Sequence, residues 1–187
     1  MKQAFITLLL VVGLFKHSKA QEKLFIDLSK SNVHWYGEYT FYFGGHDGTI
    51  DFKDGYFIKT GDKITGGEFI IDMKTIKNLD IDNAESKQGL VDHLKDPDFF
   101  DVSKHPLAFL TITNVYYESS TKAKIYAKLS IKGKTNPISF HVDFNYEMKT
   151  MTTKFKIDRM KWDISYNSKI RDGAISDAIG FEVDISL

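Results

Sequence analysis

The chain has 187 residues, of which 25 are basic and 25 acidic, with no cysteine and with aromatic side chains at 14% of positions. The lack of cysteine excludes disulfides, a thiolate nucleophile and a cysteine-linked lipid anchor, so stability must come from burial of apolar surface. The balanced charge gives no basic face or stripe of the kind that binds nucleic acid, and no nucleic-acid partner is expected.

The first predicted element is a secretory signal peptide at residues 1–20, MKQAFITLLLVVGLFKHSKA. A basic residue precedes the apolar run 4–15, and Ser18 and Ala20 are the small side chains that signal cleavage requires. The run is shorter than the about 20 residues of a membrane-spanning helix, so no transmembrane segment is expected. The alternative is an apolar strand or helix of the core. Residues 21–187 then form one periplasmic or secreted domain with about three net negative charges.

Alternating apolar and polar residues indicate a protein made mainly of β-strands. In residues 138–146, for example, Phe140, Val142 and Phe144 alternate with polar side chains. One dry and one wet face per strand is typical of antiparallel sheets, and about eight such strands close into a barrel without exposed edges. The predicted strands cover residues 23–27, 33–37, 48–58, 64–73, 108–117, 123–131, 138–146, 154–162 and 181–187, of which the first is short and the third could be two strands.

The sequence GGHDG at residues 44–48 is predicted to be the turn between the second and third strands. Its three glycines supply the positive φ angles that such a connection uses. His46 and Asp47 are expected to cap the turn by hydrogen bonding to its backbone. The alternative role for His46 is a polar contact to a ligand head group at the rim of the barrel.

One segment lacks alternation, and residues 84–96 are predicted to form a short helix there. Asp82 or Asn83 is the expected N-cap, and Pro97 ends the helix. The apolar side chains on one side of this helix are Leu90, Val91 and Leu94.

Three irregular segments are predicted outside the regular strands. Phe99 and Phe100 follow the helix in an acidic loop, and at least one of them should plug an opening of the barrel or pack the helix onto it. The alternation slips by one residue near 158–159, which predicts a bulge or a corner. Residues 166–180 are predicted to be a long loop near the C-terminus, before the last strand.

The sequence contains no recognisable catalytic or metal-binding motif. The histidines beyond residue 20 lack the i, i+4 spacing of zinc proteases, and no metal site or cofactor is expected. No G-x-S-x-G motif is present, and the inward positions of the predicted strands are nearly free of charge. We therefore expect a protein that is not an enzyme. The alternative is an enzyme acting on an apolar substrate, with His46 or His141 as a base.

The charge-free interior favours a binding protein whose barrel encloses an apolar small molecule or lipid. The sequence leaves open whether the barrel is hollow or filled by its own side chains, as in a solid-core structural domain. In a hollow barrel, burial at about 0.8 kcal/mol per methylene would drive binding of an elongated apolar chain. The candidate ligand-binding residues are Trp35, Phe41, Phe43, Ile50, Phe52, Phe69, Ile71, Phe99, Phe100, Phe140, Val142, Phe144 and Trp162, with His46 at the rim.

Three motifs occur in a characteristic order: W-x-G followed by H-x-G-T at residues 35–49, F-F-D-V-x-K-x-P at 99–106 and L-x-I-K-G-x-T-x-P at 129–137. Over residues 24–187 the chain resembles the YceI-like family of bacterial lipid- or polyisoprenoid-binding proteins. The resemblance implies a lipocalin-like antiparallel barrel, export to the periplasm, and a bound isoprenoid lipid or quinone as ligand. It also implies that a homodimer can form, and it implies no catalysis. The connection at 44–48 is more compact than in many relatives.

Overall fold

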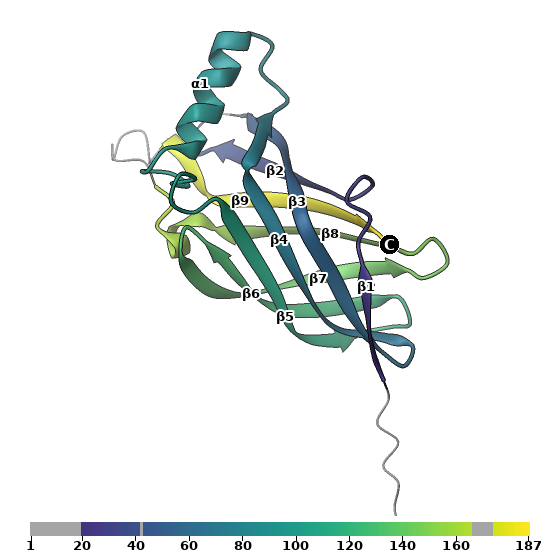
Figure 1. Ribbon diagram of the computed structural model, residues 1–187. Coiled ribbons are helices and arrows are strands. Elements are labelled where there is room, and N and C mark those ends of the chain that lie inside the picture. The colour runs from purple at the N-terminus through teal and green to yellow at the C-terminus, as the bar shows by residue number, and fades with distance from the viewer. Residues whose placement is uncertain (1–19, 42, 166–173) are drawn as a thin grey trace, which may run out of the picture.

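The computed structural model describes residues 20–41, 43–165 and 174–187 (Figure 1). The strands are β1 (Gln21–Phe25), β2 (Asn32–Tyr39), β3 (Gly45–Thr60), β4 (Lys63–Asn78), β5 (Leu107–Tyr117), β6 (Lys122–Ile131), β7 (Lys134–Asn145), β8 (Thr150–Asp158) and β9 (Ile175–Ser186). The helices are α1 (Ala84–Lys95) and the short 3₁₀ helix η1 (Arg159–Trp162). The predicted signal peptide lies outside the described residues, apart from its last position.

The strands form a closed eight-stranded antiparallel barrel with one helix, which confirms the predicted fold class. Neighbours follow one another in the order β3, β2, β9, β8, β7, β6, β5 and β4, and pairing of β3 with β4 closes the ring. β1 pairs with Tyr56–Thr60, the last part of β3, whereas β2 pairs with its first part. The third strand is therefore one long strand, and β1 extends the wall that β2 begins.

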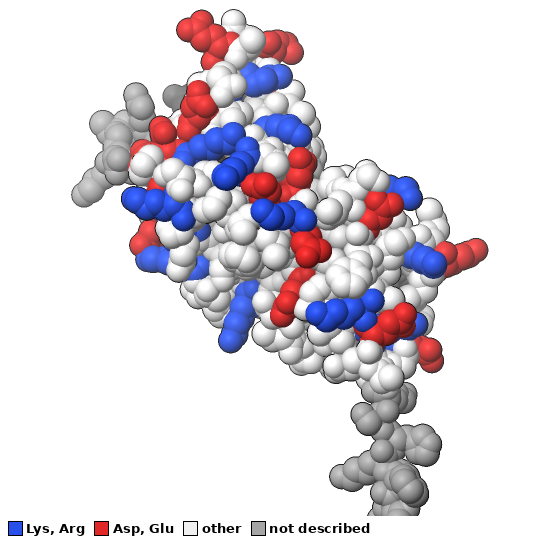
Figure 2. All heavy atoms as spheres, in the orientation of Figure 1, with Lys and Arg blue, Asp and Glu red and all other residues white. Residues whose placement is uncertain are grey.

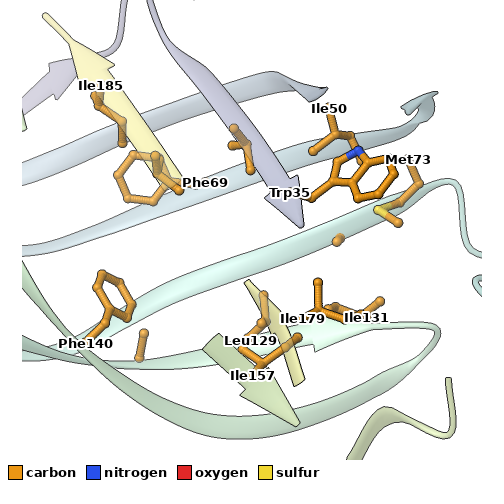
Figure 3. Close-up of a cluster of buried hydrophobic side chains, with 14 of the residues drawn as sticks. Trp35, Ile50, Phe69, Met73, Leu129, Ile131, Phe140, Ile157, Ile179 and Ile185 are labelled. Carbon is orange, nitrogen blue, oxygen red and sulfur yellow. The ribbon is translucent and has the colours of Figure 1, made fainter. Parts of the chain in front are cut away.

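Alternation along each strand places apolar side chains inside the barrel. In β6 the alternate residues Ala123, Ile125, Ala127 and Leu129 are buried, while Tyr126 between them is exposed. Figure 3 shows labelled side chains from β2, β3, β4, β6, β7, β8 and β9 gathered in this core. Since full burial of one such side chain contributes about 1.5–3 kcal/mol, the core can stabilise the fold without disulfides.

Helix α1 lies at one end of the barrel (Figure 1) and has the predicted bounds within one residue. Asn83 is the N-cap, and its side chain accepts a hydrogen bond from the Ser86 amide at 2.8 Å. Val91 and Leu94 are buried, and Leu90 is half-buried. No helix among the described residues has the length and apolar character needed to cross a membrane.

Phe99 and Phe100 are both buried, so neither side chain of this acidic loop extends into solvent. Their rings meet edge to face with centroids 5.0 Å apart. The ring of Phe99 also lies 5.7 Å from that of His93 in the helix. The short segment after α1 therefore packs under the helix rather than extending into solvent.

The predicted irregularity near residues 158–159 is a corner. β8 ends at Asp158, whose side chain accepts a hydrogen bond from the Met160 amide at 3.0 Å and caps η1. The indole of Trp162 is buried and donates to the Leu129 carbonyl at 3.0 Å. The slip in alternation thus marks the end of a strand and a helical turn, with no inserted residue.

The long loop predicted at residues 166–180 is wrong in its second half. β9 begins at Ile175, which pairs with Tyr39, and Ala178 pairs with the end of β8. The polar residues in this part of β9 disguise its alternation, so the strand was expected to begin only at residue 181. Residues 166–173 lie outside the described residues.

The connection between β2 and β3 also differs from the prediction. β3 begins at Gly45, so His46 lies inside the strand ladder and the turn comes before it. Of the three glycines, Gly44 has a positive φ, 106°, and the other two do not. They are required for close approach instead, because a Cβ on Gly48 would lie 1.8 Å from a backbone oxygen of β4.

Phe41 and Phe43 do not face the interior, which corrects their predicted orientation. Their exposed fractions are 76% and 108%. β2 ends at Tyr39, and its register with β9 shifts between Gly37 and Tyr39, so the alternation of β2 cannot be extended to residues 41 and 43. These two side chains therefore do not line the barrel.

The face of the molecule in Figure 2 carries basic and acidic side chains that intermingle among uncharged ones. Many are close enough to pair, as Lys77 and Asp51 do at 3.4 Å. Exposed pairs of this kind contribute about 0–1 kcal/mol each. The stability of the fold therefore rests on its core rather than on these charges.

Candidate ligand-binding site

The barrel encloses a central cavity of about 120 Å³ with apolar walls. The hydroxyl of Thr153, which is part of the lining, donates its proton to the His141 carbonyl at 2.6 Å. Aromatic rings form much of the wall, and Phe140 stacks on Phe155 with centroids 4.6 Å apart. The barrel is therefore hollow at its centre.

A second compartment of about 100 Å³ lies between the barrel and α1. Leu90 and Leu94 of the helix cover it, together with Phe99 from the following segment. Polar side chains line it as well as apolar ones. Those contributed by the barrel and the corner are Trp35, Glu38, Tyr39, His46, Arg159 and Ser176.

Ile50, Phe100 and Phe181 line both cavities and form the partition between them. Figure 3 shows Ile50 beside Trp35, at the same end of the buried cluster. Phe100 belongs to the segment after α1, whereas the other two belong to barrel strands. A ligand that occupies both compartments must displace part of this partition.

A chain of hydrogen-bonded side chains lies along the wall of the outer compartment. Nδ1 of His46 is 2.8 Å from Asp80, and Nε2 is 2.8 Å from the hydroxyl of Tyr39. Because an ionised carboxylate only accepts hydrogen bonds, Nδ1 carries a proton; in the neutral form of this imidazole, Nε2 then accepts from Tyr39. Asp80 also accepts from the Asp47 amide at 2.9 Å and from the side chain of Asn78.

These hydrogen bonds keep Asp80 ionised. Burial alone raises the pKa of this carboxyl, but hydrogen bonds from His46, the Asp47 amide and Asn78 outweigh burial and hold the pKa below its usual value. The predicted turn-capping role of His46 and Asp47 is wrong. His46 bonds two side chains, the Asp47 carboxylate bonds His34 at 2.6 Å, and Asp80 is the residue that accepts from the backbone.

Two nitrogen-bearing side chains are buried beside the outer compartment. Arg159 is fully buried and donates to the Ile164 carbonyl at 2.6 Å, to the Ser176 carbonyl at 3.1 Å and to Asp177 at 3.3 Å. Nε1 of Trp35 is buried and has no hydrogen-bond partner among the described residues. The protein thus provides hydrogen-bond acceptors for the guanidinium of Arg159, whereas the indole N–H of Trp35 has no acceptor among the described residues.

The opposite end of the barrel is held shut by packed rings. Phe57 is 2% exposed and meets Phe144 edge to face, with centroids 6.2 Å apart. The hydroxyl of Tyr117 accepts from the Ile64 amide at 2.8 Å and donates to the Ile64 carbonyl at 3.2 Å, which anchors the start of β4.

Most of the candidate residues lie on one of the two cavities. Ile50, Phe52, Phe69, Ile71, Phe100 and Phe140 line the central cavity. Trp35, His46, Ile50, Phe99 and Phe100 line the outer compartment. The remaining buried candidates line neither: Val142 is packed in the core, Phe144 lies at the far end, and Trp162 is held under η1.

Several residues of the site were missed from the sequence. Phe155 and Phe181 follow the same alternation as the residues that were found, and that signal was sufficient to find them. The pairing of His46 with Asp80 joins residues 34 positions apart, and no local pattern predicts it. Arg159 is a charged residue in a position that alternation assigns to apolar ones.

The other histidines within the described parts of the chain line neither cavity. His141, the second candidate base, lies on the outer surface, 3.2 Å from Glu118. His93, Asp96 and Asp98 gather near the end of α1, with ligand atoms within 4.8 Å of one another. Exposed acidic groups commonly gather without binding an ion, and this cluster assigns no function.

Closed eight-stranded barrels are either filled by their own side chains or wide enough to hold one small ligand. The family model described as the YceI-like domain matches residues 24–187. This chain therefore belongs to the YceI-like family, as the resemblance of its motifs indicated.

Relatives of known sequence or structure agree with this assignment. A UPF0312 protein of Pseudomonas putida is 29% identical over 135 residues, which are 72% of this chain and 64% of that protein. The chain thus matches less than two thirds of the length of this relative. BcnA of Burkholderia cenocepacia has a TM-score of 0.72 at 18% identity, over 86% of this chain and 98% of BcnA. The YCEI protein of Campylobacter jejuni has a TM-score of 0.51 at 20% identity, over 98% and 97% of the chains. At these identities the two structures support the fold alone.

Proposed function

We propose that this protein is an exported, non-catalytic binding protein that holds an apolar chain inside its barrel. The chain would be the tail of a polyisoprenoid or of an isoprenoid-quinone-like amphiphile. The central cavity carries the proposal, because strands enclose it and apolar side chains line it. Each methylene buried there contributes about 0.8 kcal/mol. The signal-peptide pattern of residues 1–20 supports export.

The two cavities must join and widen to hold a long chain. Their volumes are about 120 and 100 Å³, whereas pockets for drug-sized ligands occupy about 300–1,000 Å³. An engineered cavity of about 150 Å³ accommodates benzene. We infer that the ligand displaces Phe100 from the partition, because this residue lies outside the strands and can move without breaking strand pairs.

Filling the central cavity tests this proposal. Ala108 lines the cavity and is 4% exposed, so Ala108→Leu places added atoms in the ligand's space. We expect this variant to fold and to lose uptake of an added polyprenyl quinone. The matched control is Phe109→Leu, at the next position, where the side chain is 44% exposed and uptake should be unchanged. Equal uptake by both variants would contradict binding in the barrel.

The Tyr39–His46–Asp80 chain favours a second candidate function, an enzyme acting on an apolar substrate with His46 as base. A carboxylate orients this imidazole, as it does in many general bases. Nε2 already accepts from Tyr39, so a substrate proton must reach it through that hydroxyl. The ligand recovered from wild type and from His46→Ala distinguishes the two functions. A binding protein yields the same molecule from both, whereas an enzyme yields product from wild type alone.

A further inference from the structure

The barrel wall is split between β7 and β8, which are neighbours in the ring (Figure 1). In the described parts of the chain, these two strands pair only where residues 143–145 face residues 150–152. On their other sides the pairing is long, because β6 pairs with residues 134–143 of β7 and β9 pairs with residues 150–158 of β8. Strand pairing therefore does not join the rest of the two facing edges.

The sequence of β7 suits an edge that stays unpaired. The His141 carbonyl accepts a hydrogen bond from the hydroxyl of Thr153 in β8 at 2.6 Å, so the backbone of His141 faces the split. Because alternate residues of a strand direct their backbone groups to the same side, Ser139 and Pro137 face the split as well. Proline has no N–H to donate and is found at the edges of sheets. Pro137 thus offers β8 no hydrogen-bond donor.

Two side-chain contacts close the split at the level of the central cavity. The register of β7 and β8, continued along the strands, places Phe140 opposite Phe155, and their rings stack with centroids 4.6 Å apart. The second contact is the hydrogen bond from Thr153 to the His141 carbonyl. Phe140, Phe155 and Thr153 all line the central cavity. Side chains, rather than a hydrogen-bonded sheet, therefore separate this part of the cavity from the outside.

A groove of about 380 Å³ lies over the next part of the split. Residues of β7 line one side of it and residues of β8 line the other. Ile138 is half-buried and Ile157 is buried, so the groove offers apolar surface between its polar side chains. Ser139 and Lys156 in the lining are the sequence neighbours of the two stacked rings. The groove thus leads from the outer surface to the ring stack.

The two ends of the barrel are each covered by several buried side chains. Leu94, Phe99 and Phe100 are buried at the α1 end. Phe57 and Phe144 are buried at the other end and pack edge to face. Opening the split, in contrast, separates one ring stack and one side-chain hydrogen bond and breaks no strand pair.

We propose that the split between β7 and β8 is the portal through which the apolar ligand enters and leaves the central cavity. The groove over the split is the site where the ligand first binds, before Phe140 and Phe155 separate and admit it. This inference rests on the proposed function, because the portal serves the ligand of the central cavity. It concerns the route and the rates of exchange, whereas the proposed function concerns what is held.

A reversible cross-link over the split tests the portal in the full mature chain. The protein has no cysteine, so Ser139→Cys combined with Lys156→Cys introduces one reactive pair. The continued register places these two exposed positions opposite each other. A short bis-methanethiosulfonate joins them through disulfides, and a reductant releases them. The matched control is Ser139→Cys combined with Tyr126→Cys, which ties β7 to its paired neighbour β6 and leaves the split free.

The measurement is the rate of uptake and of release of an added polyprenyl quinone, for each variant before and after cross-linking. Tryptophan fluorescence, which a bound quinone quenches, follows both rates. We expect the cross-link between positions 139 and 156 to slow both rates by about tenfold or more and to leave their ratio unchanged, since one barrier is crossed in both directions. Reduction should restore both rates. The cross-link between positions 126 and 139 should change neither rate.

Thr153→Val gives a second measurement that needs no cross-link. It removes the hydroxyl that joins the two edges and keeps the branched shape of the side chain. We expect uptake and release both to become faster, by up to about tenfold for the loss of one hydrogen bond. The control is Thr152→Val, at an exposed position where β7 and β8 are paired. A change in release alone would mean that Thr153 acts on the bound ligand, and it would contradict the portal.

The outcomes separate this inference from the proposed function. Quinone exchange at the same rates before and after cross-linking of positions 139 and 156 would overturn the portal and leave the binding function standing. Equal slowing by both cross-links would also overturn the portal, because the control does not bridge the split. Failure of wild type to bind the quinone at all would overturn both.

Discussion

His46 and Asp80 form a hydrogen-bonded pair, with Nδ1 of the imidazole 2.8 Å from the carboxylate, although 34 positions separate them in the chain. The side chains are 31% and 28% exposed and lie at the edge of the outer compartment. The pair joins the start of β3 to the segment after β4. The pair therefore orients the imidazole ring, which lines the compartment, and links these two segments at the rim of the barrel.

The first prediction concerns the pH dependence of stability. Folding lowers the pKa of Asp80, so its stabilising contribution is complete above the usual carboxyl pKa of about 4 and is lost as the pH falls through the folded-state value. The gap in unfolding free energy between wild type and Asp80→Asn should be present at pH 7 and should shrink below about pH 4. Urea unfolding measures this gap. A gap that does not change with pH would contradict the role assigned to Asp80, and Asp51→Asn, at an exposed pair, is the control.

The second prediction concerns the partition between the cavities. Phe100→Ala should cost about 3–5 kcal/mol of stability and should raise the affinity for longer isoprenoid hydrocarbons relative to shorter ones, because it joins the two spaces. Phe99→Ala is the control, since Phe99 is also buried and lines the outer compartment without lining the central one. Titration with hydrocarbons of increasing length measures the effect. The same length dependence in both variants would show that Phe100 is not the partition.

The third prediction concerns the buried guanidinium at the corner after β8. Arg159→Met should destabilise the fold by about 3 kcal/mol, because it leaves the buried carbonyls of Ile164 and Ser176 without their donor. Asp177→Asn should cost less than about 1 kcal/mol, since the side chain of Asp177 is 69% exposed. Thermal or urea unfolding compares them. Equal losses would mean that the ion pair, rather than the carbonyl contacts, holds the corner.

The fourth prediction uses two glycines with opposite surroundings. Gly48→Ala should destabilise by about 1–3 kcal/mol, because the new Cβ would lie 1.8 Å from the Lys77 carbonyl oxygen. Gly89→Ala should stabilise α1 by up to about 1 kcal/mol, because no atom lies within 4 Å of the new Cβ and alanine favours the helix. Melting temperatures of the two variants should move in opposite directions. A stable Gly48→Ala protein would show that β3 and β4 can separate there.

The alternation of apolar residues was sufficient to predict the barrel and much of the cavity wall, and the helix was predicted from the segment where alternation stops. Ile50, Phe52 and Phe69 line the central cavity because strand parity places them inside. The same rule failed at Phe41 and Phe43, where a register shift and the end of β2 break the alternation. Alternation predicts whether a side chain points inward only for residues that lie within the strand.

The polar part of the site was not predictable in this way. Tyr39, His46 and Asp80 meet because the pairing of β2 with β3 and of β3 with β4 brings three separate segments together. The register of the paired strands brings these side chains into contact, and the pattern of a single sequence does not specify the register between distant segments. The role of Arg159 was not predictable for a related reason, because two of its partners, Ser176 and Asp177, lie at the start of β9.

If the barrel holds an apolar chain, the purified protein should carry one, and identifying the bound molecule tests this. The mature protein is purified without detergent, extracted with organic solvent and examined by mass spectrometry, with Ala108→Leu treated in parallel. We expect an isoprenoid or similar long-chain molecule from wild type and its loss from the variant. The absence of any such molecule, together with no uptake of added polyprenyl quinone, would contradict it.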